Sequence, residues 1–103
     1  MKDGMIGLDT ERAKALGFTS DKFDGYLWKD RDAVFVSFIV SKRRGNFREL
    51  VQRILALGLS VKIPTPLGRM QEIVRKNGYR KTVETTEQGD LVEVWTLSSE
   101  ARS

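Results

Sequence analysis

The stretch from residue 33 to residue 57, AVFVSFIVSKRRGNFRELVQRILAL, constrains the fold more than any other part of the chain. Residues 33–40 are almost all apolar and rich in Val, Ile and Phe, which is typical of a strand buried on both faces. A basic turn with one glycine follows, and from Asn46 the apolar residues recur every three or four positions, as in a helix. A strand, a basic turn and a helix in this order place N–H groups and positive charge where a phosphate can bind. The residues of the basic turn are Lys42, Arg43, Arg44 and Gly45.

The positive charge of the chain is concentrated in its middle. Residues 1–40 carry six Lys or Arg against seven Asp or Glu, residues 41–81 carry eleven against two, and residues 82–103 carry one against five. The net charges of the three segments are therefore −1, +9 and −4, which sum to the +4 of the whole chain. A basic block of this kind suits a polyanion or a phosphorylated ligand.

Composition excludes several classes of chemistry. The chain has no Cys and no His, so it cannot use a thiolate nucleophile, a His base or a metal site built from these residues. We expect no metal. Its 103 residues suffice for one domain, and no apolar run approaches the roughly 20 residues of a membrane helix. We therefore expect a single domain over 1–103, without membrane association and in the cytoplasm.

The remaining segments predict an α/β (α+β) fold with the order α-β-β-α-β-α-β-β. Residues 1–25 are predicted to be irregular or helical, with a short helix from Asp9 to Gly17. A hairpin joins a strand at 25–29 to the strand at 33–40, and a final hairpin joins 79–86 to 91–97. Thr65 and Pro66 are the residue types expected at the cap and first position of a helix. The predicted central helices are 46–57 and 66–77, and 98–103 is predicted to be a flexible polar tail.

The strands 33–40 and 59–63 are joined by a helix, so they should form a parallel pair with a right-handed crossover. The rest of the sheet is predicted to be mostly antiparallel. With this order, residues 25–97 resemble the GNAT superfamily, the Gcn5-related N-acetyltransferases, as a short and divergent member of phage type. Three features carry the resemblance: the basic turn followed by Leu50 and Val51, the Asn77-Gly78-Tyr79 sequence after the second helix, and Trp95 in the last hairpin.

The resemblance implies a ligand and its site. The ligand would be acetyl-CoA or another acyl-CoA, whose pyrophosphate would lie on the turn amides and the start of the next helix. Its pantetheine would run beside the preceding strand, where a bulge or splay opens backbone groups. Residue by residue, the implied cofactor-binding positions are Ile39, Val40, Lys42, Arg43, Arg44, Gly45, Asn46 and Arg48. The implied activity is N-acyl transfer by direct attack of an amine on the bound thioester.

The sequence departs from the family pattern at residues that matter for catalysis. Phe47 stands where the family has a small residue, and Val74 stands where it has a Tyr that protonates the leaving thiolate. These departures predict degenerate catalysis, and no catalytic residue is assigned. The alternative is a non-catalytic GNAT-like module that binds a protein or nucleic-acid partner through the basic block at 42–81. The acceptor and the oligomeric state are left open.

Overall fold

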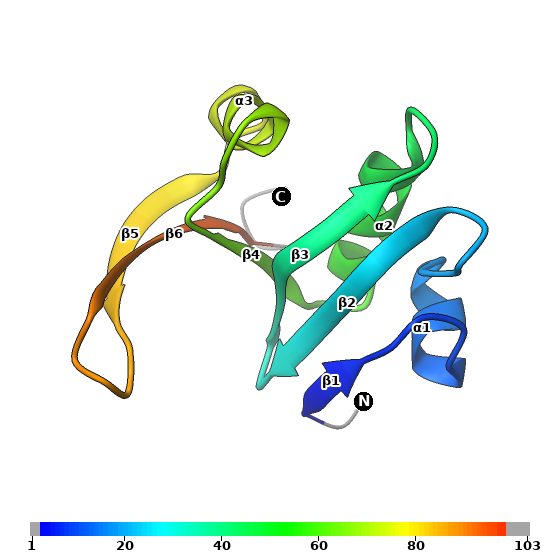
Figure 1. The fold of residues 1–103 in the computed structure, drawn as a ribbon, viewed down its shortest axis with the longest axis horizontal. Coiled ribbons are helices and arrows are strands. Elements are labelled where there is room, and N and C mark those ends of the chain that lie inside the picture. The colour runs from blue at the N-terminus through cyan, green and yellow to red at the C-terminus, as the bar shows by residue number, and fades with distance from the viewer. Residues whose placement is uncertain (1–2, 99–103) are drawn as a thin grey trace.

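The computed structural model describes residues 3–98 and shows an α+β domain built on one mixed sheet of six strands with three helices (Figure 1). The strand order in the sheet is β1-β2-β3-β4-β6-β5, and only β3 and β4 are parallel. The elements are β1 (Gly4–Ile6), α1 (Glu11–Leu16), β2 (Phe23–Asp30), β3 (Ala33–Ser41), α2 (Asn46–Ala56), β4 (Ser60–Pro64), α3 (Arg69–Lys76), β5 (Arg80–Thr85) and β6 (Leu91–Leu97).

The first two helices begin and end close to where their sequences predict. Thr10 caps α1, because its Oγ1 accepts a hydrogen bond from the Ala13 N–H at 3.2 Å. Gly17 ends α1 in the left-handed conformation, with a φ of 76°. The helix α2 buries Leu50, Val51, Ile54 and Leu55, which recur at helical spacing and pack toward the sheet. The helix expected at 46–57 is thus confirmed to within one residue.

The parallel pairing of β3 with β4 is confirmed, but it is short. Only Ala33, Val34 and Phe35 have partners in β4, namely Ser60, Val61 and Lys62. Beyond Phe35 the two strands diverge, β4 pairing with β6 while β3 continues beside β2. The prediction of a strand buried on both faces is therefore wrong for the second half of β3, where Phe38 and Val40 are 57% and 52% exposed. An apolar run cannot reveal where a strand loses its neighbour.

The helix α3 begins later than its sequence predicts. Thr65 has a left-handed φ of 43°, and its N–H donates to the Glu93 carbonyl at 2.8 Å, so it extends the pairing of β4 with β6 and caps no helix. The first helical residue is Arg69, directly after Gly68. The prediction of a helix at 66–77 with Pro66 at its first position is therefore wrong at its start. Only Val74 of α3 is buried, and this helix is tied to the core less firmly than α2.

The N-terminal segment contains a strand that its sequence did not predict. The strand β1 pairs antiparallel with β2, placing Met5 opposite Trp28. Next to it the ammonium of Lys29, whose side chain is 7% exposed, binds the Asp3 carboxylate at 2.9 Å. The prediction that residues 1–25 are only irregular or helical is thus incomplete. Of the predicted tail, residues 99–103 lie outside the described part of the chain.

The two faces of the sheet differ. The helices α1 and α2 cover one face, and the core between them and the sheet includes Phe18, Phe23, Leu27, Ile54 and Val61 (Figure 1). On strands β1 to β3 the opposite face carries the exposed side chains of Met5, Tyr26, Trp28 and Phe38. The rings of Tyr26 and Phe38 stack at 6.3 Å between centroids. None of the helices in the described residues is long and apolar enough to cross a membrane.

Candidate functional site

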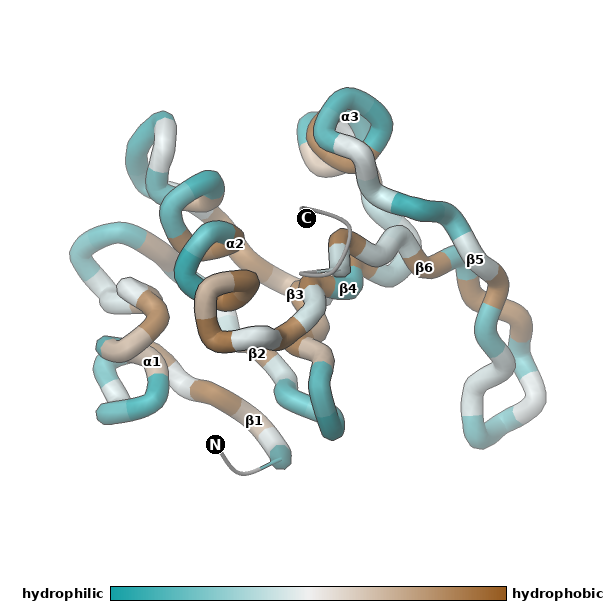
Figure 2. The backbone as a smooth tube through the Cα atoms, turned by 180° about the vertical axis from the view of Figure 1, so that it is seen from behind, coloured by the Kyte–Doolittle hydropathy of each residue, from teal (hydrophilic) through white to brown (hydrophobic). Residues whose placement is uncertain are grey.

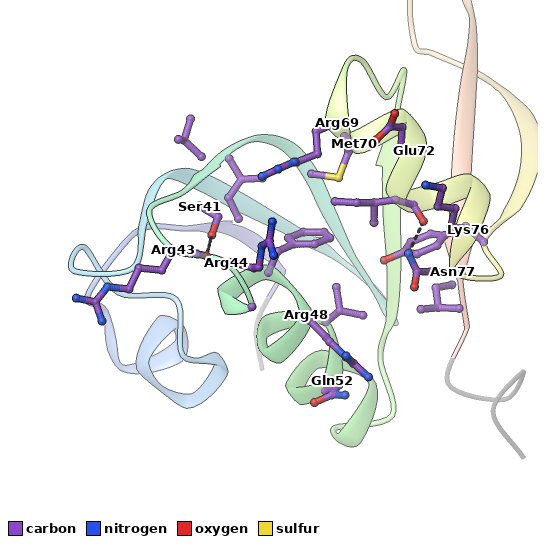
Figure 3. A pocket seen from close by; sticks show the side chains of 18 of the residues that line it. Ser41, Arg43, Arg44, Arg48, Gln52, Arg69, Met70, Glu72, Lys76 and Asn77 are labelled. Carbon is purple, nitrogen blue, oxygen red and sulfur yellow. Dashed lines mark hydrogen bonds between the residues drawn. The ribbon is translucent and has the colours of Figure 1, made fainter.

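A cavity of about 900 Å³ lies between α2 and α3, above the place where β3 and β4 diverge. We call it the interhelical cavity. Its wall on one side is the end of β3, the basic turn and α2, and its wall on the other side is α3 (Figure 3). A volume of this size is typical of sites that hold a small ligand or a cofactor.

The floor of the interhelical cavity is apolar. Phe47, Val51 and Leu55 reach it from α2, and Met70 and Ile73 reach it from α3. Phe47 is partly buried and also packs against the core. The apolar contributions from the sheet are Ile39, Val40 and Leu97. This lining suits an uncharged, elongated part of a ligand.

The start of α2 presents free backbone donors at the rim of the cavity. Gly45 precedes the helix with a φ of 92°, and no side chain caps the first turn. The first hydrogen bond of the helix joins the Glu49 N–H to the Gly45 carbonyl at 3.1 Å. Within residues 3–98, the N–H groups of Arg44, Gly45, Phe47 and Arg48 have no acceptor. Unpaired N–H groups at a helix start, with the helix dipole behind them, bind anions.

Cationic side chains line the same cavity as these donors. Arg44 and Arg48 enter from the turn and α2, and Arg69 and Lys76 enter from α3 (Figure 3). Glu72 is the only carboxylate among the lining residues that the structure describes. Arg43 contributes to the lining, but its guanidinium extends away from the cavity (Figure 3). The site therefore combines an apolar floor with a cationic rim, which fits a ligand with an uncharged chain and several negative charges.

The second half of β3 offers backbone N–H and C=O groups on the side that faces away from β2. After Phe35 this strand has β2 on one side and no strand on the other. A second cavity of about 190 Å³ occupies the gap between β3 and the segment that leads to α3. The two cavities share Ile39, Leu67 and Met70. An elongated ligand that lies along β3 would therefore extend through both cavities.

The structure brings together six of the eight site residues predicted from the sequence. Ile39, Val40, Arg43, Arg44, Gly45 and Arg48 all line the interhelical cavity. Lys42 does not, because its ammonium donates to the Ser20 carbonyl at 2.7 Å and lies 3.9 Å from the Asp24 carboxylate. Asn46 does not either, because its side-chain amide donates to the Lys22 carbonyl at 3.1 Å. Both side chains fasten the basic turn to the loop before β2.

Sequence reasoning did not assign Arg69, Met70 or Lys76 to the site. The missing information is the direction of α3, which brings residues more than twenty positions away from the basic turn to the other side of the cavity. The basic block of the sequence includes Arg69 and Lys76. Charge alone gives no way to separate them from its other members.

Tyr79 is a candidate for proton transfer at this site. Val74, the residue that the sequence resemblance aligns with a tyrosine, is fully buried in the core. Tyr79, in contrast, lines the interhelical cavity and is 7% exposed. Burial raises the pKa of Tyr79 to about 12, so its hydroxyl is protonated at neutral pH and is a weaker acid than that of an exposed tyrosine.

Comparison with known proteins does not place the chain: no family model, curated protein or solved structure matches it. The described residues also contain no cluster of Asp and Glu that could hold a metal ion. The functional argument therefore rests on the geometry of the interhelical cavity.

Proposed function

We propose that this protein binds acyl-CoA in the interhelical cavity as a GNAT-like N-acyltransferase. The observation that carries the proposal is the set of free N–H groups of Arg44, Gly45, Phe47 and Arg48, beside the cationic rim and above the apolar floor. The pyrophosphate would lie on these amides, and the pantetheine would run over Ile39 and Val40 along the open edge of β3.

Two features of the sheet support the GNAT-like interpretation. The first is the parallel pair β3 and β4 joined by α2, followed by α3 and a terminal hairpin. The second is the divergence of β3 and β4 after three residue pairs. Such a divergence fits the splay that the family resemblance implies beside the pantetheine, where strand N–H groups would polarise a thioester carbonyl.

The chemistry can proceed without a His or Cys. The amine nitrogen of the acceptor forms a bond to the acyl carbon, the carbon–sulfur bond breaks, the amine loses a proton and the thiolate gains one. The residues of this chain would orient the reactants and stabilise the charge on the carbonyl oxygen. Tyr79 would supply the proton to the sulfur.

The test is a titration of ¹⁵N-labelled protein with CoA, followed by amide NMR. We expect selective shifts of the Gly45, Phe47 and Arg48 signals, because their N–H groups would bind the pyrophosphate. Amides of α1 serve as the internal control, since α1 contributes no lining residue to the cavity. If millimolar CoA leaves the turn amides unshifted, the proposal is wrong.

Acyl transfer is tested separately from binding. With acetyl-CoA and a panel of primary amines, we expect thiol release that depends on the amine and falls at least tenfold in Tyr79→Phe, with unchanged CoA affinity. Binding without any thiol release would leave a non-catalytic CoA-binding module. Retention on single-stranded DNA without CoA binding would favour the nucleic-acid alternative.

A further inference from the structure

We propose that two copies of this chain associate through β5, antiparallel and across a two-fold axis at Thr82, to form one continuous sheet of twelve strands. This inference concerns the far edge of the sheet and does not depend on the proposed function. It follows from the position of β5, the alternation of its backbone groups and the sequence of its charges.

The strand β5 is an open edge. It ends the strand order, so one side pairs with β6 and the other side meets no strand in residues 3–98. The hairpin of β5 and β6 projects from the rest of the molecule, with β5 on its outer side (Figure 2). Arg80, Lys81, Thr82 and Val83 are all exposed, and Val83 is 61% exposed. The opposite edge, β1, has three residues, whereas β5 has six. A six-residue edge offers N–H and C=O groups that another strand can pair with.

Strand geometry allows few ways to pair β5 with its own copy. Residues that face each other in an antiparallel ladder either both bond across it or both point away from it. Bonding direction alternates along a strand, so two facing residues of identical strands are both even-numbered or both odd-numbered. The two residue numbers of every facing pair therefore add up to the same even number. Only two arrangements keep the strand centred: Thr82 faces Thr82 of the second copy, or Val83 faces Val83.

The charges of β5 distinguish the two arrangements. When Thr82 lies on the axis, Arg80 of each copy faces Glu84 of the other, so two opposite-charge pairs form. When Val83 lies on the axis, Lys81 faces Thr85 and Glu84 faces Thr82, so no charge pair forms. The first arrangement is therefore the one that the sequence of the strand favours. Charged edge residues usually discourage association, but here their signs are complementary in one register.

Glu84 shares a sheet face with Arg80 and Thr82, and its present ion pair is with Lys62 of β4, on the inner side of β5. Its carboxylate binds the Lys62 ammonium at 3.2 Å. Arg80 makes no ion pair with any other residue in the described part of the chain. In the dimer the carboxylate would lie between Lys62 of its own chain and an arginine of the second copy. A carboxylate has enough acceptor sites for both donors.

The first experiment is sedimentation equilibrium of the whole chain between 5 and 500 µM, in roughly physiological salt. We expect a mass that rises to twice 11.7 kDa.

Arg80→Glu places like charges opposite each other and should raise the dissociation constant at least tenfold. The double variant Arg80→Glu/Glu84→Arg should restore association to within about threefold of wild type. The control, Glu11→Lys, reverses an exposed charge on α1 and should change nothing. Circular dichroism checks that each variant is folded.

The second experiment fixes the axis and uses the absence of native cysteine. Thr82→Cys should form an intermolecular disulfide under mild oxidation, since facing Cα atoms in a ladder lie about 4.5–5.5 Å apart. Thr85→Cys, also exposed and on the same strand, should not, because it would face Tyr79. A wild-type monomer at 500 µM, an unchanged dissociation constant in Arg80→Glu, or equal cross-linking of both cysteine variants would each overturn the proposal.

Discussion

At the scale of single residues, two cations of the basic turn have different environments. Lys42 is held by Ser20 and Asp24 outside the interhelical cavity, whereas Arg44 lies at its rim. The sequence shows both as members of one basic run. The difference comes from a loop some twenty positions earlier in the chain, which a local pattern cannot reveal. The sequence therefore predicted where the basic residues of this site lie along the chain, but it did not predict which side chains point toward the cavity.

This difference predicts unequal effects of two matched substitutions on CoA binding. Arg44→Ala should weaken CoA binding at least about tenfold, since a charge-assisted hydrogen bond to phosphate contributes about 1.5–3 kcal/mol and about 1.4 kcal/mol is a factor of ten. Lys42→Ala should change the affinity less than about twofold, because its ammonium faces Ser20 and Asp24. Isothermal titration calorimetry at fixed salt measures both. A larger loss in Lys42→Ala than in Arg44→Ala would contradict the placement of the site.

Tyr79 predicts a dependence of stability on alkaline pH. Its pKa is about 12 in the folded protein and about 10 when unfolded. Between these values the unfolded state loses the proton first, so the free energy of unfolding falls as pH rises. From pH 8 to pH 11.5 the free energy of unfolding of the wild type should fall by about 2 kcal/mol more than that of Tyr79→Phe. The slope of this difference is at most about 1.4 kcal/mol per pH unit. Urea unfolding of both proteins measures this difference, and equal losses would show that the hydroxyl titrates normally.

At the scale of the elements, the pairing of β2 with β3 requires a glycine at position 25. The sequence alone gives no reason for this requirement. The register shifts between Tyr26 and Trp28, and Gly25 lies just before this irregularity with a φ of 112°. A Cβ at this position would lie 2.2 Å from the Phe38 carbonyl oxygen. The close approach follows from the path of β3, so the hairpin was predictable and the need for glycine in it was not.

Two glycine substitutions separate the close approach from backbone strain. Gly25→Ala should reduce the free energy of unfolding by more than about 3 kcal/mol, because it adds a backbone collision to an unfavourable φ. Gly4→Ala has a similar φ of 120° with nothing within 4 Å of the added carbon. It should cost only about 1 kcal/mol. Chemical unfolding compares the variants, and equal losses would mean that strain alone accounts for Gly25.

Element order was predictable because apolar spacing changes with secondary structure, as the confirmed α2 and the β3–β4 pair show. The start of α3 was not predictable, because Thr65 and Pro66 have the residue types of a helix cap while Thr65 continues the pairing toward Glu93. The strand β1 was not predictable either, since three residues form a strand only when β2 is beside them. In each failure a tertiary contact determined the local structure.

At the scale of the whole molecule, the interhelical cavity exists because the sheet opens. The strand β3 leaves β4 after Phe35, and α3 is carried away from α2 on the far side of the gap. The helix α3 is fixed by one buried residue, Val74, whereas α2 has four. Few buried contacts make an element easy to open locally. The molecule thus joins a firm wall, formed by β3 and α2, to a loosely held one.

This asymmetry predicts how hydrogen exchange responds to a ligand. In the free protein the amides of Arg69–Lys76 should exchange at least about tenfold faster than those in the middle of α2, because opening α3 exposes little apolar surface. CoA would contact Arg69 and Lys76 on one wall and Arg48 on the other, so saturation should slow exchange in α3 more than in α2. Exchange measured by mass spectrometry gives both rates. The amides of α1 are the control, and protection confined to α2 would show that the ligand does not bridge the two walls.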